Sequence, residues 1–246
     1  MQADLYSATG NILWISIVPG LQEADLSDYA ATTQLLCKDQ QADGLLLANA
    51  ETHEVWVLNP DGSNGGFCGN GLRAVAFHLG HVSGATELAL EMSGVKMQAK
   101  CEGDQVKLAF VPKLSLIKAG EIGGVSVYQL TVPNPHCVVV NPPESWTFPE
   151  TAQHLCERFD CNVEFVFLNK AQGVQAVPSV FVYERGAGPT GACGSGAIAT
   201  FKVLQNLGVV TDQVTLAFPG GNLTVCQQED KLLLSGLVKW IKTTCI

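Results

Sequence analysis

Two cysteines, each followed by a glycine-rich turn, are the residues of this sequence best suited to do chemistry. Cys68 stands in FCGNGLR and Cys193 in ACGSGAI. Glycine permits backbone conformations that other residues resist, so the amides after each cysteine can point together at the start of a helix. Such a helix end carries partial positive charge, binds anions and favours a thiolate over a thiol. We therefore predict two anion-binding loops, each with a cysteine of lowered pKa.

Taken alone, either loop is also explained as a tight turn before a buried helix, with the cysteine as a small core residue. Two such loops in equivalent places favour a shared task. A thiolate on one side of a bound carbon could remove a proton while a thiol on the other side returns one. That pair of steps inverts a stereocentre.

The sequence around the two loops is repeated. Residues 59–80 and 183–208 each read as a strand, a glycine-rich loop, a cysteine and a helix, and the upstream Asn11 and Asn134 are similarly spaced from Cys68 and Cys193. An internal duplication explains this pattern and predicts two similar domains. We place them at 1–115 and 116–235, with the join near residues 111–125.

Short apolar runs bounded by Gly, Pro, Asn or Asp dominate the rest of the chain and predict strands. Helices are expected after each cysteine, ending near Gly80 and Gly208, and at two further segments, of which the first has Ser27 as a candidate N-cap. The expected strands cover residues 11–18, 44–49, 54–59, 105–111, 127–132, 136–141, 163–169, 179–184, 214–220 and 231–238, and the two further helices cover 26–38 and 149–159.

Composition excludes several classes of function. The formal net charge of −9 argues against nucleic acid as a partner, which needs clustered Lys and Arg. No apolar run is long enough for a transmembrane helix, and the first twenty residues lack the pattern of a secretory signal, so we expect no membrane partner. Nine cysteines without CxxC spacing fit reduced thiols in a cytoplasmic protein and give no metal site.

Several segments resemble the diaminopimelate epimerase family, whose members are amino-acid racemases and epimerases that use no pyridoxal cofactor. The matching segments occur in the family's order: TGN with Asn11, NPDGSNGGFCGNGLR from Asn59, PNPH from Pro133, NVEFV from Asn162 and ERGAGPTGACGSGA from Glu184. The resemblance implies an α/β (α+β) fold of two similar domains. Each would be a mostly antiparallel sheet wrapped around a central helix, with the active site in the cleft between them and residues 236–246 returning to the first domain.

The resemblance also assigns roles near the reacting carbon. Cys68 and Cys193 become the two acid/base residues. The substrate's α-carboxylate would be held by the backbone amides of Gly69, Asn70, Gly194 and Ser195. The carboxylate of Glu184 would hold the α-ammonium. Asn11 and His136 would make contacts near the reacting amino group.

At the far end of the substrate, Arg185 would pair with a distal carboxylate, for which its bidentate fork is suited. Asn59, Asn134 and Asn162 would contact the distal amino-acid group, although an asparagine alone is equally a turn former. Asp61 and Ser63 are expected to shape their loop. Pro60 and Pro133 stand where the family usually carries a small residue and a glycine, next to the expected distal pocket.

These roles predict a cofactor-independent epimerase that converts LL-2,6-diaminopimelate to the meso form, a step of lysine and peptidoglycan synthesis. The expected substrate is a small-molecule amino acid, and no cofactor or metal is implied. Because homodimers occur among relatives, a homodimer is also expected. A related racemase of histidine or glutamate is the first alternative. A non-enzymatic ligand-binding or redox protein, with Cys68 and Cys193 as a regulatory disulfide, is the second.

Overall fold

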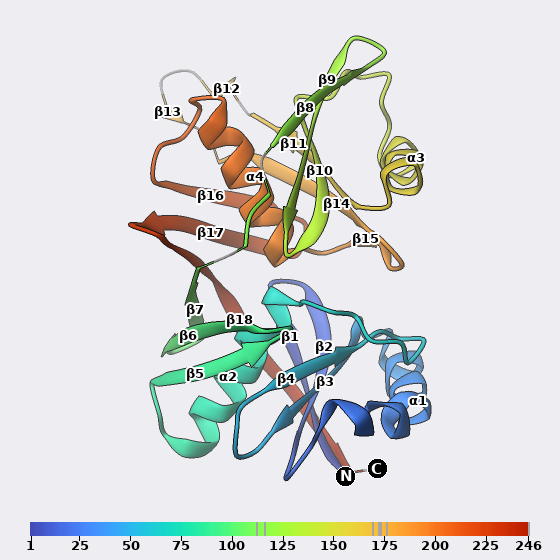
Figure 1. Cartoon of the computed structure of the whole chain (residues 1–246), viewed down its shortest axis with the longest axis vertical. Helices are drawn as coiled ribbons and strands as arrows, with labels where there is room; N and C mark the ends of the chain where they lie inside the picture. The colour runs from blue at the N-terminus through green and yellow to red at the C-terminus, as the bar shows by residue number, and fades with distance from the viewer. Residues whose placement is uncertain (112, 116, 169, 172–173, 176, 246) are drawn as a thin grey trace. The chain divides into compact units, whose positions relative to one another are not determined.

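The structure, a computed structural model, describes residues 1–111, 113–115, 117–168, 170–171, 174–175 and 177–245. The chain divides into two compact units, Met1–Val111 with Ser235–Ile246 and Pro112–Leu234 (Figure 1). The join expected near 111–125 lies partly outside the described residues. Within the described ranges the chain forms mainly strands with four α-helices, which confirms a mixed α/β fold.

The first unit contains a sheet in the order β4-β3-β2-β1-β18, and β18 also pairs with β7, β7 with β6 and β6 with β5. All the registered pairs here are antiparallel except β2 with β3. The elements are β1 (Gln2–Ala8), β2 (Asn11–Val18), a 3₁₀ helix η1 (Glu23–Tyr29), α1 (Ala30–Gln40), β3 (Gly44–Asn49), β4 (Val55–Leu58), α2 (Gly69–Ser83), β5 (Glu87–Met92), β6 (Val95–Glu102), β7 (Gln105–Phe110) and β18 (Lys231–Cys245).

Burial explains how the strands of this unit divide. Every residue of β3 is buried, as expected for a strand that pairs in parallel with β2 and lies between other elements. In β5 and β6, by contrast, apolar residues alternate with exposed polar ones, so only one face is covered. Helix α2 packs against β1, β2, β3, β5, β6 and β7 (Figure 1). The apolar faces of both sets of strands therefore enclose the helix that follows Cys68.

The second unit has strands in the order β8-β9-β10-β11-β14-β16-β17, with β15 paired to β14. Strands β10 and β11 run parallel, with His136 opposite Asn162, and the β14–β16 bridge is also parallel. The elements are β8 (Lys118–Ile122), β9 (Val125–Val132), β10 (Asn134–Val140), α3 (Glu150–Phe159), β11 (Asn162–Phe167), β12 (Lys170–Ala171), β13 (Val174–Gln175), β14 (Ser179–Glu184), β15 (Gly188–Thr190), α4 (Gly194–Asn206), β16 (Gln213–Phe218) and β17 (Gly221–Gln228).

Helix α4 holds the same place in the second unit that α2 holds in the first. It packs against β9, β10, β11, β16 and β17, while α3 covers β10, β11 and β14 (Figure 1). All residues of α4 from Gly194 to Phe201 are buried. A helix that is buried all round must present apolar or small residues on every side, which the sequence GSGAIATF does. Each unit thus centres on the helix that begins at its cysteine loop.

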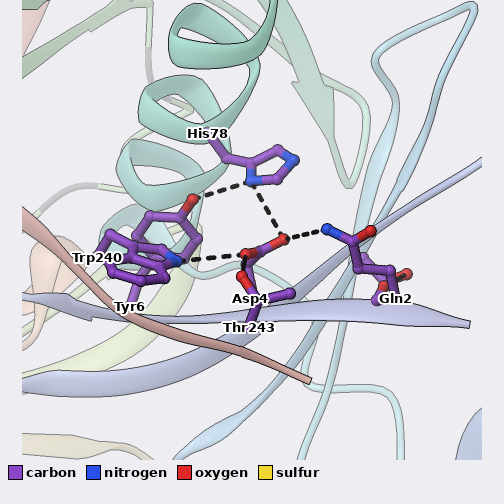
Figure 2. Close-up of polar contacts among 7 residues, drawn as sticks. Gln2, Asp4, Tyr6, His78, Trp240 and Thr243 are labelled. Carbon is purple, nitrogen blue, oxygen red and sulfur yellow. Dashed lines mark hydrogen bonds and ion pairs between the residues drawn. The ribbon is translucent and has the colours of Figure 1, made fainter. Parts of the chain in front are cut away.

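The C-terminal half of β18 is tied into the first unit by a carboxylate, Asp4 of β1 (Figure 2). Asp4 Oδ1 accepts a hydrogen bond of 3.2 Å from Trp240 Nε1 and another from the Thr243 hydroxyl. Its Oδ2 lies 3.9 Å from His78 Nδ1 of α2, and this nitrogen is 2.9 Å from the Tyr6 hydroxyl. One buried acidic residue therefore links β1, β18 and the later part of α2.

Each predicted strand run overlaps an observed strand, although residue 169 at the end of one lies outside the described part of the chain. Two details of the helices were predicted wrongly. Ser27 lies within η1, and α1 begins after Tyr29, which makes no side-chain cap. Helix α2 continues beyond Gly80 to Ser83 because the left-handed residue that ends it is Gly84, with φ 75°.

Candidate functional site

The two cysteine loops have the same local geometry. Cys68 (φ −133°, ψ 96°) and Cys193 (φ −128°, ψ 121°) are the N-cap residues of α2 and α4. In α2 the amide of Gly71 donates to Cys68 Sγ at 3.3 Å, and in α4 the amide of Gly196 donates to Cys193 Sγ at 3.4 Å. Each sulfur therefore caps the helix it precedes, as serine or aspartate does elsewhere.

The next amide of each helix donates to the carbonyl oxygen of its cysteine, at 3.0 Å from Leu72 and 2.9 Å from Ala197. The first two residues of each helix precede these bonds and lie at its N-terminus, where backbone amides point out of the helix. They are Gly69 and Asn70 in α2, and Gly194 and Ser195 in α4, and all four are buried. This arrangement can receive a carboxylate at each helix N-terminus.

The two thiols differ in their surroundings. Cys68 is half-buried and Cys193 is buried. Burial raises the pKa of Cys193 well above its ordinary value, and the carboxylates of Glu184 and Glu164 raise it further, against hydrogen bonds from Ser195 and Gly196. The expectation of a lowered pKa is therefore wrong for Cys193: desolvation and two nearby negative charges outweigh the helix terminus. In the unliganded protein these effects favour the thiol form of Cys193.

A chain of buried hydrogen bonds lies beside Cys68. Arg73 Nη2 donates to Asn70 Oδ1 at 2.7 Å, Asn70 Nδ2 donates to Asn11 Oδ1, and Asn11 Nδ2 donates to Asp43 Oδ2 at 3.3 Å. Arg73 also donates to the Thr9 hydroxyl at 3.0 Å. Because a guanidinium only donates and a carboxylate only accepts, the chain fixes the orientation of both asparagine amides. It brings the predicted site residues Asn11 and Asn70 together.

Near Cys193, the predicted site residues His136 and Glu184 each make a polar contact with another side chain. His136 Nδ1 lies 2.7 Å from Glu164 Oε1, and both side chains are fully buried. Thr190 donates its hydroxyl to Glu184 Oε1 at 2.5 Å. The Ser195 hydroxyl lies 3.4 Å from Cys193 Sγ. The second unit therefore surrounds its cysteine with carboxylates and hydroxyls.

Asn59 belongs to a turn of its own. Its Nδ2 donates to the Ser63 hydroxyl at 3.0 Å, and its backbone amide donates to the Ser63 carbonyl at 2.8 Å. Asp61 Oδ1 accepts from the amide and the hydroxyl of Ser63, at 2.9 and 2.6 Å. Asp61 and Ser63 thus shape the loop, as expected, and Asn59 takes part in the same hydrogen bonds.

Of the residues predicted to bind the distal end of the substrate, the structure brings Asn162 and Arg185 into contact. Asn162 is buried at the start of β11, and Asn134 is half-buried at the start of β10. Asn162 Oδ1 accepts from the backbone amide of Arg185 at 2.9 Å. The exposed Arg185 guanidinium pairs with Asp160 Oδ2 at 2.9 Å, on the surface of the same unit. A surface ion pair of this kind is weak, so a ligand carboxylate can displace it.

Sequence reasoning missed three charged residues of these surroundings: Arg73, Asp43 and Glu164. Arg73 and Glu164 are fully buried. Both residues could have been recognised from the sequence, because Arg73 interrupts the apolar run GLRAVAF and Glu164 interrupts NVEFVF. A single charge inside a buried element needs a specific partner.

Other kinds of site find little support in the described part of the chain. No group of three His, Cys, Asp or Glu residues there is placed to hold a metal ion. None of its helices has the length and apolar character needed to cross a bilayer. A surface hollow of about 400 Å³ in the second unit is lined by Val125, Tyr128, Asn141 and Leu207 among others, and it includes neither cysteine.

Comparison with known sequences gives the family. Residues 128–240 match the family model described as diaminopimelate epimerase. A diaminopimelate epimerase from Nitratiruptor sp. is 30% identical over 256 residues, which cover 99% of this chain and 98% of that protein. One from Desulfitobacterium hafniense is 31% identical over 84% of each chain.

Solved structures show that the fold is shared more widely. A putative phenazine biosynthesis PhzC/PhzF protein from Clostridium difficile matches with a TM-score of 0.75 at 10% identity, covering 100% of this chain and 99% of that one. A hydroxyproline epimerase from Agrobacterium vitis, with bound trans-4-OH-L-proline, matches with a TM-score of 0.67 at 18% identity, covering 99% and 91%. By sequence, the chain belongs to the diaminopimelate epimerase family.

Proposed function

We propose that this protein is a cofactor-independent isomerase that converts LL-2,6-diaminopimelate to the meso form, using Cys68 and Cys193 as its two acid/base residues. The observation that carries the proposal is the pair of matched helix N-termini, each capped by a cysteine sulfur. One such loop would serve as an anion site. Two of them in one chain supply a base and an acid of the same chemical type.

In the proposed reaction one cysteine, as thiolate, removes the α-proton, and the other, as thiol, delivers its proton to the opposite face of the same carbon. This requires the two sulfurs to flank one bound α-carbon. The α-carboxylate accepts hydrogen bonds from the amides of Gly69, Asn70, Gly194 and Ser195. The same amides stabilise the negative charge that builds on this carboxylate as the proton leaves. They must carry this task alone, because the proposed reaction uses no electron-withdrawing cofactor.

The rest of the substrate is assigned by family resemblance and local contacts. Glu184 receives the α-ammonium, and Asn11 and His136 lie towards the reacting amino group. Asn59, Asn134 and Asn162 contact the distal amino-acid group, while Arg185 exchanges Asp160 for the distal carboxylate. An acidic substrate suits this exchange because a bidentate carboxylate pair is stronger than the exposed contact it replaces.

The setting proposed for the protein follows from its thiols. None of the nine cysteines is in a disulfide, and the reaction needs both loop cysteines reduced. A reducing compartment such as the cytoplasm meets that need. We propose a homodimer as its assembly on family resemblance alone.

Incubation with candidate amino acids in heavy water tests reaction and substrate together. Purified protein, fully reduced, is mixed separately with LL-diaminopimelate, L-histidine and L-glutamate, and α-deuterium is followed by mass spectrometry. Incorporation into diaminopimelate with formation of the meso isomer supports the proposal. Incorporation into histidine or glutamate alone replaces the substrate, and no incorporation into any of them removes the enzymatic assignment.

A further inference from the structure

Different residues contact the first turns of α2 and α4, at equivalent places in the two units. A Cβ atom on Gly71 would lie 2.5 Å from Leu46 Cδ2, and one on Gly196 would lie 2.4 Å from Glu164 Oε1. Leu46 is the third residue of β3 and Glu164 the third of β11, and these strands pair in parallel with β2 and β10. Leu46 and Glu164 are therefore structural counterparts, one apolar and one acidic.

The first unit has a buried cation instead. Arg73 is fully buried and donates to Asn70, to Thr9 and, at 3.3 Å, to the Leu237 carbonyl. No ion pair to Arg73 occurs among the residues that the structure describes, and the chain to Asp43 runs through two neutral amides. Burial lowers the pKa of Arg73 to about 10, and a negative charge on Cys68 opposes that shift. A guanidinium and a thiolate that interact in this way stabilise each other's charged forms.

The second unit has a buried acidic side chain, Glu164. Glu164 Oε1 accepts the 2.7 Å hydrogen bond from His136 Nδ1, while Glu164 Oε2 and His136 Nε2 have no hydrogen-bond partner among the described residues. Glu164 Oε1 is also the atom that a Cβ on Gly196 would meet, so this carboxyl group faces the first turn of α4, and its charge raises the pKa of Cys193.

We propose that Arg73 and Glu164 are positioning residues that give the two cysteines opposite resting states, with Cys68 a thiolate and Cys193 a thiol. The inference rests on the proposed two-cysteine function. The two helix termini are alike and make similar contributions, so the difference comes from the deeper burial of Cys193 and from the buried charges. At Cys193 the charge of Glu184 raises the pKa more than that of Glu164, and the two effects add. His78 and His81, the other titratable groups of α2, lie roughly 15–20 Å further along that helix.

The proton balance of one turnover follows from these states. Cys68 takes the α-proton and becomes a thiol, and Cys193 gives its proton to the opposite face and becomes a thiolate. Cys68 must then lose a proton to solvent, and Cys193 must gain one, before the same direction can run again. No net proton is consumed. The buried charges favour this return because they stabilise only the starting arrangement.

The test measures ionisation at each cysteine without substrate. Full-length protein is treated with iodoacetamide over a range of pH, and mass spectrometry follows modification at Cys68 and Cys193 separately. The pH midpoint of each rate reports thiolate formation, whereas the plateau reports access to the reagent. We expect a lower midpoint for Cys68 than for Cys193. Equal midpoints, or the reverse order, would overturn the inference.

Variants identify the responsible charges. Glu164→Gln keeps the hydrogen bond from His136 and should raise the rate at Cys193 near neutral pH about tenfold, with Cys68 unchanged. Arg73→Met should lower the rate at Cys68 about tenfold, and Arg73→Lys should restore most of it. Glu157→Gln, which removes an exposed carboxylate of α3, is the matched control and should change neither midpoint. An unchanged Cys193 midpoint in Glu164→Gln contradicts the role of Glu164, even if the Arg73 variants fail to fold.

The two proposals fail separately. If Cys68 and Cys193 are both essential for isomerisation but titrate alike, the proposed function stands and this inference falls. If either cysteine is dispensable, the proposed function itself is wrong, whatever their midpoints.

Discussion

The side-chain carbonyl of Asn162 accepts a 2.9 Å hydrogen bond from the backbone amide of Arg185. Asn162 begins β11 and Arg185 follows the end of β14, so one buried asparagine fixes the backbone from which the arginine projects. The guanidinium itself is exposed and paired with Asp160. Arg185 is therefore anchored at its base while its charged end can change partners.

This anchoring predicts a defect in substrate binding for Asn162→Ala. Loss of one hydrogen bond to the Arg185 backbone should raise KM for diaminopimelate roughly fivefold to tenfold. Asp160→Asn, which removes only the competing surface charge, should leave KM equal or lower. Steady-state kinetics on both variants decide the matter, and an unchanged KM in Asn162→Ala would show that this contact does not serve substrate binding.

Gly71 is required for close packing beneath α2. Because its Cβ would meet Leu46 Cδ2 at 2.5 Å, Gly71→Ala should lower the free energy of unfolding by about 1–3 kcal/mol. In the double variant with Leu46→Ala, the two effects should be less than additive, since the smaller side chain makes room for the methyl group. Urea denaturation of the two single variants and the double variant measures this coupling, and strict additivity would contradict the contact.

How far the sequence predicts the site is shown by Cys193 and Arg73. The two loops, their cysteines and the following helices could be recognised because glycine spacing and repetition are local properties. The raised pKa of Cys193 could not, because it depends on burial and on the charges of Glu184 and Glu164, of which Glu164 is distant in sequence. Arg73 was visible as a charge in an apolar run, but its partners Thr9 and Leu237 are brought to it only by the fold.

The strands show the same division. Apolar runs such as 44–49 correspond to buried strands, whereas β6 was not expected, because its Lys and Gln residues alternate with the buried Val95, Met97 and Ala99. A search for apolar runs passes over such a half-exposed strand, although its two-residue period was present in the sequence. The pairing of β1 with β18, from opposite ends of the chain, has no local signal beyond family resemblance.

Asp4 should matter for stability rather than catalysis. Asp4→Ala leaves Trp240 Nε1 and the Thr243 hydroxyl without their acceptor, so the free energy of unfolding should fall by about 1–3 kcal/mol. Trp240→Phe removes a single donor and should cost less than Asp4→Ala. Chemical denaturation together with kcat tests this expectation, and wild-type stability in Asp4→Ala would show that the contacts in Figure 2 contribute nothing.

His78 should make stability depend on pH. Burial lowers the pKa of His78 below its ordinary value of 6.5, against the attraction of Asp4. The unfolded chain therefore binds a proton at a higher pH than the folded chain, so this contribution to stability is present above about pH 6.5 and is lost as the pH falls below it. His78→Asn should flatten the pH dependence of unfolding between pH 7 and 5 (about the range in which histidine titrates). An equally steep dependence in the variant would assign it to other groups.

The measurement that tests the central claim most directly is the early distribution of deuterium between substrate and product. LL-diaminopimelate is incubated with the protein in heavy water and sampled in the first few per cent of conversion, with Cys68→Ala and Cys193→Ala run in parallel. Two cysteines acting from opposite faces predict deuterium in the meso product, little in the remaining substrate, and no isomerisation by either variant. Equal deuterium in recovered substrate and product, or isomerisation by one of the variants, would contradict the account.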